Sequence, residues 1–227
     1  MRYKRANIDS LNLSSPYLEA ILIYNEDYTI EIIKSKSRFI PKRWSETFGK
    51  ALTKNIIEAK IIHTHLGLTL PLKVFAATPK KQTVEFAGLH GYNERSKLLY
   101  LTLEDLRERL QYARVTRIDI AIDFEGRVPQ GIIKTLSRHR EPFKYGNTTY
   151  WKTPKEKKTN RKMDIKIYDK AHQAGLKDPL MRLEFVFKAE YLKKLFLKEI
   201  ETAYLKMEKS IKKAAGISVK IDPLFPL

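Results

Sequence analysis

The sequence contains no cysteine, and this absence limits the chemistry open to the protein. Without thiols there can be no disulfide, no thiolate zinc site and no cysteine nucleophile. Any metal ion must therefore be held by carboxylate, imidazole or water ligands. Long apolar runs are also missing: none approaches 18 residues, and the N-terminus carries no signal-like segment. We therefore expect a soluble, cytoplasmic protein with no membrane partner.

Two further absences concern organisation and ligand class. No linker rich in Gly or Ser and no internal repeat divides the chain, so we expect residues 1–227 to form a single domain. No glycine-rich phosphate loop is present either. This absence argues against an acid–base enzyme for a small substrate.

Acidic residues are scarce relative to basic ones. The 227 residues include 44 Lys and Arg against 26 Asp and Glu, which gives a formal charge of +18 and a pI near 9.8. Such an excess is typical of proteins that bind a polyanion. Nucleic acid is therefore the first candidate partner.

The segment from Lys162 to Lys170, KMDIKIYDK, alternates apolar and polar residues as a β-strand does. One face would carry Met163, Ile165 and Ile167, and the other Asp164, Lys166, Tyr168 and Lys170. Tyr168 would then lie between two lysines. Nearby positive charge favours phenolate and attracts phosphate, so Tyr168 is a candidate nucleophile.

Two other segments repeat this design. In TRIDIAIDF, Ile118, Ile120, Ile122 and Phe124 share one face, and Arg117, Asp119 and Asp123 share the other. Asp119 and Asp123 would lie about 13 Å apart, too far to share one ion, so a second carboxylate would have to come from a neighbouring strand. In MRLEFVFK, Arg182 and Glu184 lie opposite an apolar face. Glu85 has the same position in TVEFA. Together these strands predict one shared site.

The remaining pattern predicts an α+β fold: one mainly antiparallel sheet, with helices on its apolar face and the site on the other. Two β-rich runs are expected in Tyr17 to Lys34 around Asn25-Glu26-Asp27, and a strand pair over Ala59 to Ala77. The expected helices are Trp44 to Ala59, a helix capped by Thr102 and Asp105, Pro129 to Arg138, and a basic C-terminal helix over 190–215 that ends at Gly216.

A hairpin is predicted between 148–152 and 162–170. Its tip, TPKEKKTNR, is strongly basic. Such a loop suits a phosphate backbone. The candidate DNA-binding residues here are Lys155, Lys157, Lys158 and Arg161, with Arg117 and Arg182 on the strands.

The order of these motifs resembles that of a known family. R-x-D-x-x-x-D-F at 117–124, x-I-Y-D-K ending at Lys170 and R-L-E at 182–184 are similar to motifs of the trans-acting replication initiator (Rep) proteins of rolling-circle plasmids. TTYW at 148–151 and V-E-F at 84–86 add to the similarity, which covers roughly residues 80 to 190. More loosely, the chain resembles the replication initiation factors of filamentous phages.

The resemblance implies an enzyme that nicks one DNA strand at a single-stranded origin, for which a hairpin is one candidate form, and later rejoins it. A tyrosine stays joined to the 5′ phosphate, and the free 3′ hydroxyl is extended by a host polymerase. The resemblance makes Tyr168 the nucleophile, flanked by Lys166 and Lys170. It makes Asp119 and Glu184, then Asp123 and Glu85, the ligands of Mg²⁺ or Mn²⁺. A host helicase would unwind the DNA, and a homodimer is left open.

Two alternatives remain open at this stage. His63-Thr64-His65 has the spacing of the His-hydrophobe-His metal motif of other rolling-circle nucleases and relaxases, although Thr64 departs from the hydrophobe. A non-catalytic single-stranded DNA- or RNA-binding protein would use the same sheet as a platform. Carboxylates favour an enzyme over a pure binder, because they repel phosphate unless a metal ion lies between.

Overall fold

The protein is described here by a computed structural model, in which residues 4–16, 18, 27–37, 55–74, 82–152 and 162–225 are described. The strands are Lys4–Ser15 (β1), Tyr28–Ser37 (β2), Asn55–His63 (β3), Thr69–Val74 (β4), Gln82–Ala87 (β5), Arg114–Glu125 (β6), Glu141–Tyr145 (β7), Thr148–Lys152 (β8), Met163–Asp169 (β9), Leu180–Lys188 (β10) and Val219–Ile221 (β11). The helices are Glu94–Asp105 (α3), Arg107–Leu110 (α4), Gln130–Ser137 (α5), Lys170–Ala174 (α6), Ala189–Leu192 (α7), the 3-10 helix Leu197–Ala203 (η3) and Tyr204–Ala215 (α8).

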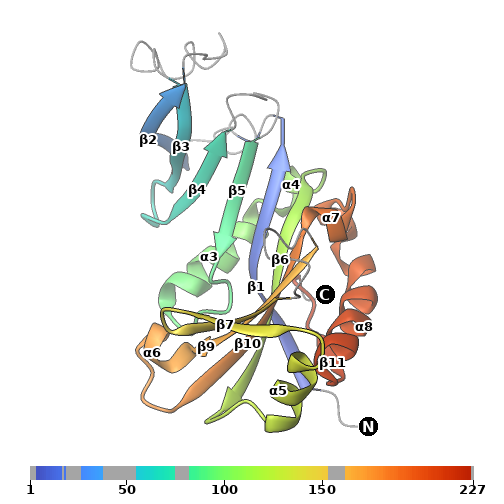
Figure 1. Cartoon of the computed structure of the whole chain (residues 1–227). Coiled ribbons are helices and arrows are strands. Elements are labelled where there is room, and N and C mark those ends of the chain that lie inside the picture. Colours follow the sequence, from blue (N-terminus) through green and yellow to red (C-terminus); the bar gives the residue numbers. More distant parts are fainter. Residues whose placement is uncertain are drawn as a thin grey trace.

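The described strands form one sheet in the order β2-β3-β4-β5-β1-β6-β10-β9-β8-β7, with β11 beside β1 (Figure 1). Neighbours along this order are antiparallel, and β11 pairs with β1 in parallel. The predicted α+β fold with a mainly antiparallel sheet is therefore confirmed. No helix in the described part of the chain is both long and apolar enough to span a membrane.

The alternating segments form the centre of the sheet. Ile120 pairs with Phe185, which pairs in turn with Ile165, and all three side chains are at most 1% exposed. Burial of each such side chain stabilises the fold by about 1.5–3 kcal/mol. The period of two thus places one full face of β6, β10 and β9 in the core.

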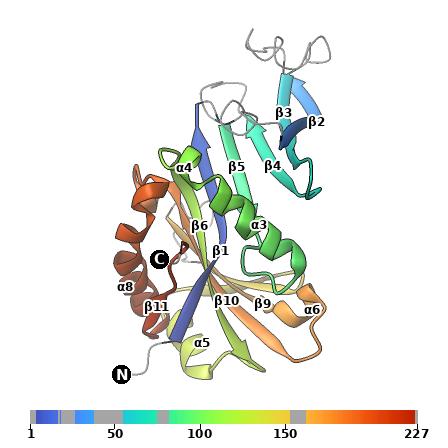
Figure 2. The same ribbon diagram turned by 180° about the vertical axis from the view of Figure 1, so that it is seen from behind.

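Helices cover this apolar face. Leu99 and Leu103 of α3, Leu136 of α5, and Met207 and Ile211 of α8 all belong to the same buried cluster as the strand residues. Figure 2 shows α3 across one part of the sheet and α8 beside another. The short helix α6 is different, because its Lys170 is buried near the polar residues of the opposite face.

The expected helix over 190–215 is wrong in its middle. α7 ends at Leu192, and Lys193 and Lys194 have positive φ angles of 37° and 48°. The next residues pair with β6: the Val115 amide donates to the Leu195 carbonyl at 2.8 Å, and the Leu197 amide donates to the Ala113 carbonyl at 3.0 Å. Backbone groups used in this pairing cannot close helical turns. α8 then ends at Gly216, as predicted.

Other boundaries also differ from the prediction. A helix was expected over Trp44 to Ala59. Its residues 44–54 lie outside the described part of the chain, and residues 55–59 belong to β3 instead. The expected cap at Thr102 lies inside α3, whose start is capped by Asn93 through a 2.9 Å bond from the Ser96 amide. The sequence pattern did not reveal the strand β7. Residues 19–26 and the basic tip 153–161 lie outside the described part of the chain.

Candidate active site

The register of the sheet brings the predicted site residues onto one face. Glu184 pairs with both Ala121 and Lys166, and Arg182 pairs with both Asp123 and Tyr168. Asp119 pairs with Ser10 of β1. Glu85 joins the same face through Asn12, which pairs with both Glu85 and Arg117.

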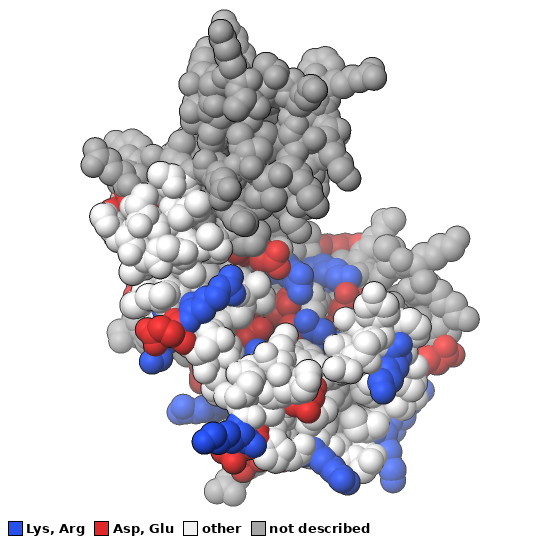
Figure 3. Space-filling model, turned by 90° about the vertical axis from the view of Figure 1, so that its left-hand side faces the viewer, with Lys and Arg blue, Asp and Glu red and all other residues white. Residues whose placement is uncertain are grey.

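These residues surround a pocket of about 410 Å³. Its lining is mainly polar and includes Glu85, Arg117, Asp119, Lys166, Tyr168 and Glu184. Figure 3 shows a hollow in which acidic and basic side chains gather. The lining also includes Lys170 and Gln173 of α6 and Asn93 and Ser96 at the start of α3. Both helix ends therefore border the pocket.

Tyr168 is held by Glu184. Its hydroxyl donates a hydrogen bond of 2.9 Å to Glu184 Oε2, and only 9% of the residue is exposed. Lys166 Nζ lies 2.8 Å from the other oxygen, Glu184 Oε1, and 5.6 Å from the centre of the Tyr168 ring. Glu184 thus contacts a hydroxyl and an ammonium at the same time.

The expectation that lysines favour the Tyr168 phenolate is wrong in this geometry. Burial raises the pKa of Tyr168 well above its usual range, and the negative charge of Glu184 raises it further. Lys166 directs its charge to Glu184 at 2.8 Å. Tyr168 is therefore a neutral phenol in contact with a proton acceptor, and its activation requires transfer of the proton.

Asp119 is buried beside Arg117. The guanidinium donates from Nε to Asp119 Oδ1 at 2.7 Å and from Nη2 to Oδ2 at 2.5 Å. Burial nevertheless raises the pKa of Asp119 to about 7, helped by the hydrogen-bonding contact with Glu184 and opposed by Arg117. Burial acts in the same direction on Glu184, but Lys166 and the hydrogen bonds to this carboxylate outweigh it and lower its pKa. Below about pH 7 the pair therefore holds one proton, on Asp119, and a charge on Glu184.

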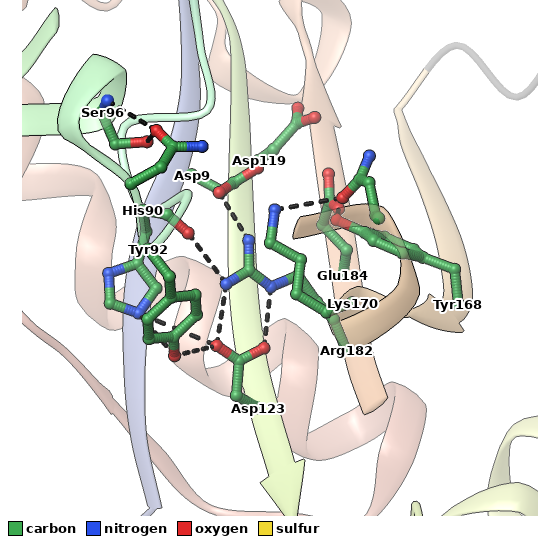
Figure 4. A network of polar contacts seen from close by, with 12 residues as sticks. Asp9, His90, Tyr92, Ser96, Asp119, Asp123, Tyr168, Lys170, Arg182 and Glu184 are labelled. Carbon is green, nitrogen blue, oxygen red and sulfur yellow. Dashed lines mark hydrogen bonds and ion pairs between the residues drawn. The ribbon is translucent and has the colours of Figure 1, made fainter. Parts of the chain in front are cut away.

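Arg182 forms the centre of a second network (Figure 4). Its Nε and Nη2 donate to the two oxygens of Asp123 at 2.7 and 2.8 Å, and its Nη1 donates to Asp9 at 2.6 Å. Nη2 also donates to the His90 carbonyl at 2.9 Å. The residue is 0% exposed. Arg182 is therefore a buried anchor, and the expected contact with DNA is wrong.

The same network occupies Asp123. Besides Arg182, it accepts a 2.5 Å hydrogen bond from Tyr92, and His90 Nε2 lies 3.7 Å from it. Burial opposes its charge, but the bonds from Arg182 and Tyr92 hold the pKa of Asp123 below its usual value. Of the expected metal ligands, Asp119 and Glu184 are therefore adjacent, whereas Asp123 belongs to the Arg182 network.

Sequence reasoning missed Asp9, His90 and Tyr92. A register shift between Ile8 and Ser10 inserts Asp9 into β1 as a bulge, and no alternation pattern indicates this. His90 and Tyr92 lie in the turn after β5, where Tyr92 has a φ of 60°. A tyrosine in this left-handed conformation is uncommon and is a signal that only the structure provides.

The other predicted residues have mixed positions. Lys170 begins α6 instead of ending the strand, yet it lines the pocket and donates to Gln173 Oε1 at 3.0 Å. Glu85 lies 3.8 Å from Arg117 at the pocket wall. Arg117 is 35% exposed and could reach a ligand. The loop residues Lys155, Lys157, Lys158 and Arg161 lie outside the described residues.

The histidine pair lies apart from this site. His63 ends β3, and His65 lies in the following turn, where its Nε2 is 3.3 Å from Asp27. The two ring centres are 6.1 Å apart. Neither residue lines the pocket around Tyr168. In the part of the chain that is described, no three His, Asp or Glu side chains form a group that could hold a metal ion.

Comparisons with known proteins provide little help with function. No family model and no curated protein matches the chain. Among solved structures, Methanococcus jannaschii TBP matches with 10% identity and a TM-score of 0.35. The match covers 92% of this chain and 99% of that one. A likeness this distant does not bear on function.

Proposed function

We propose that this protein nicks and rejoins single-stranded DNA through Tyr168, as a rolling-circle replication initiator. The observation that carries the proposal is the 2.9 Å hydrogen bond from the Tyr168 hydroxyl to Glu184, inside a polar pocket lined by four cationic residues, Arg95, Arg117, Lys166 and Lys170. The net charge of +18 suits a polyanionic substrate. The family resemblance over residues 80 to 190 supports the same reaction.

In the proposed step, Tyr168 Oη attacks the scissile phosphorus and forms a 5′-phosphotyrosine bond. The P–O3′ bond breaks, and the DNA end leaves with a 3′ hydroxyl. The phenol proton passes to Glu184 Oε2, which already accepts it in a hydrogen bond. The departing 3′ oxygen takes up a proton. Asp119, whose pKa is raised to about 7, holds one inside the same pocket. Attack by the 3′ hydroxyl on the phosphotyrosine reverses these transfers and rejoins the strand.

Cations of the pocket would stabilise the phosphate during displacement. Arg117 and Lys166 each contact a carboxylate, and Lys170 lines the same pocket. A scissile phosphate entering the pocket offers these groups a second anionic partner. Charge stabilisation of this kind is the largest contribution in many phosphoryl-transfer sites.

The donor set fits a hard divalent ion in its chemistry. Asp119, once it has lost its proton, and Glu184 would supply oxygen ligands, and Mg²⁺ commonly binds through one or two carboxylates together with substrate phosphates. A bound ion would then take the place of the proton on Asp119. Bound there, Mg²⁺ or Mn²⁺ would polarise the phosphate and offset its developing charge. Arg117 and Lys166 would have to turn from the two carboxylates toward the phosphate.

A non-catalytic binder of single-stranded DNA or RNA is the second candidate. The specific observation in its favour is that Asp119 and Glu184 are each in contact with a cation. The face therefore repels phosphate less than its carboxylates alone would suggest. In this reading Tyr168 only packs and donates its hydrogen bond.

An adduct assay separates the two candidates. The protein is incubated with a random single-stranded oligonucleotide library and Mn²⁺, then denatured and separated by electrophoresis. An enzyme of the proposed type yields protein covalently joined to DNA, and the adduct disappears with EDTA. Reversible binding without any adduct would favour the binder.

The proposal of a replication initiator also includes a host helicase, a host polymerase, a homodimer and a cytoplasmic location.

A further inference from the structure

The strand β7 exposes two large aromatic side chains beside the proposed nicking site. All five of its residues are exposed, with Phe143 at 52% and Tyr145 at 73%. β7 ends the order of the described strands (Figure 1). Full burial of such a side chain would stabilise the fold by about 1.5–3 kcal/mol, and these positions leave half or more of that area exposed. Exposed aromatic residues grouped in this way mark a binding surface.

The register places these aromatic residues on the face that carries Tyr168. Phe143 pairs with Tyr150, which pairs with Lys166. Tyr145 pairs with Thr148, which pairs with Tyr168 itself. Directly paired residues share a face of the sheet. Phe143, Tyr145 and Tyr150 therefore extend the floor of the pocket outward.

The surface is continuous with the pocket. Thr148 and Tyr150 of β8 already line it, and β7 pairs directly with β8. Two strand spacings of about 4.8 Å place Tyr145 roughly 10 Å from Tyr168. That span corresponds to about three nucleotides at a stacked rise of about 3.4 Å.

We propose that Phe143, Tyr145 and Tyr150 form a stacking platform for the bases next to the scissile phosphate. This inference rests on the proposed function, because it takes single-stranded DNA as the occupant. The pocket supplies cations for phosphate, and the platform supplies flat apolar rings at nucleotide distance. Single-stranded nucleic acid is the ligand that presents phosphates and unpaired flat bases together. The platform accepts any base, since each base has a π face.

The test compares two probes that carry the same phosphates. Fluorescence anisotropy measures binding of a twelve-residue oligothymidine and of a twelve-residue abasic strand, with unchanged protein and with F143A and Y145A. The unchanged protein should prefer the oligothymidine. Each variant should lose roughly tenfold in affinity for oligothymidine and little for the abasic strand. Loss confined to the probe with bases identifies stacking and excludes a general loss of charge or fold.

Tyr112→Ala is the matched control, because Tyr112 is 65% exposed and lies after α4, away from the pocket lining. It should keep the preference for bases. Equal loss on both probes, or unchanged affinity in F143A and Y145A, would overturn the platform. If F143A and Y145A leave DNA binding unchanged and alter only the oligomeric mass of the protein in solution, β7 is instead an interface between copies of this chain. The adduct assay is independent: base-dependent binding without an adduct would leave the platform standing and reject the nicking proposal.

Discussion

At the scale of single residues, the site depends on how Asp119 and Glu184 share charge. Both are 1% exposed, and they contact each other while each also contacts a cation. Glu184 keeps the charge because Lys166 and Tyr168 both donate to it. Asp119 holds the proton below about pH 7. This division provides one acceptor and one donor within a single pocket, which is what reversible nicking requires.

The raised pKa of Asp119 predicts a pH dependence of stability. Between roughly pH 4 and pH 7 the folded protein holds a proton that the unfolded chain has released, so this contribution to stability falls as pH rises. Asp119→Asn cannot titrate. The free energy of unfolding of the unchanged protein minus that of Asp119→Asn should therefore decrease from pH 4 to 7 and then level off. Urea denaturation at each pH measures it.

Asp123→Asn serves as the control for this experiment. Burial disfavours its charge, but Arg182 and Tyr92 hold the pKa of Asp123 below its usual value. Its contribution is therefore complete above the unfolded pKa of about 4 and is lost only at lower pH. The corresponding difference should be flat between about pH 5 and 7. A flat difference for Asp119→Asn as well would contradict the proposed sharing of one proton.

Replacing Glu184 separates metal binding from DNA binding. Glu184→Gln keeps the size of the side chain and removes its charge, so Mn²⁺ affinity measured by electron paramagnetic resonance should fall by about tenfold or more. Affinity for single-stranded DNA should stay the same or increase slightly, because one negative charge is gone. His63→Ala is the comparison. Loss of Mn²⁺ binding in His63→Ala but not in Glu184→Gln would move the metal site to the histidine pair.

At the scale of elements, the alternating strands could be predicted from the sequence, and the departures from regular structure could not. β6, β9 and β10 follow their apolar alternation, so the shared face of Asp119, Tyr168 and Glu184 was accessible without a structure. The bulge at Asp9 inserts a residue that no period reveals. The break after Leu192 arises from pairing of Leu195 and Leu197 with β6, a tertiary effect that overrides helical spacing.

The Arg182 network shows the same limit at the site itself. The R-L-E motif suggested a cation facing DNA, yet burial depends on what covers the residue. The turn after β5 supplies the His90 carbonyl and Tyr92, and β1 supplies Asp9. His90 and Asp9 lie 92 and 173 residues away in the chain from Arg182, and Asp123 lies 59 residues away. Only the folded topology brings them together.

The end of α8 provides a stability prediction for an element. Gly216 has a φ of 74°, and an added Cβ would lie 3.4 Å from Thr135 Oγ1. Gly216→Ala should destabilise the fold by about 1–2 kcal/mol, because the left-handed conformation is unfavourable for residues with a Cβ. Gly131→Ala, in α5, has open space and should stabilise the fold by up to about 1 kcal/mol. Thermal unfolding compares both. Equal effects of the same sign would contradict the assigned cap.

At the scale of the whole molecule, the charge of +18 predicts how DNA binding responds to salt. Each phosphate contact on a single strand should lower log K by about 0.7 per tenfold increase in salt. A protein that contacts several phosphates should therefore show a steep slope in a titration from low to high sodium chloride. The platform variants should keep this slope, because stacking releases few counterions. A nearly flat salt dependence would contradict nucleic acid as the partner.

The most direct measurement concerns the covalent bond to Tyr168. After incubation with single-stranded DNA and Mn²⁺, nuclease digestion and mass spectrometry should find a nucleotide on the peptide that contains Tyr168. Tyr168→Phe removes one oxygen, so it should keep its fold and its DNA affinity but form no adduct. Tyr150→Phe should still form one; Tyr150 lies on the adjacent strand β8 and pairs with Lys166, two residues before Tyr168. An adduct that persists in Tyr168→Phe, or that maps to another tyrosine, would contradict the proposed nucleophile.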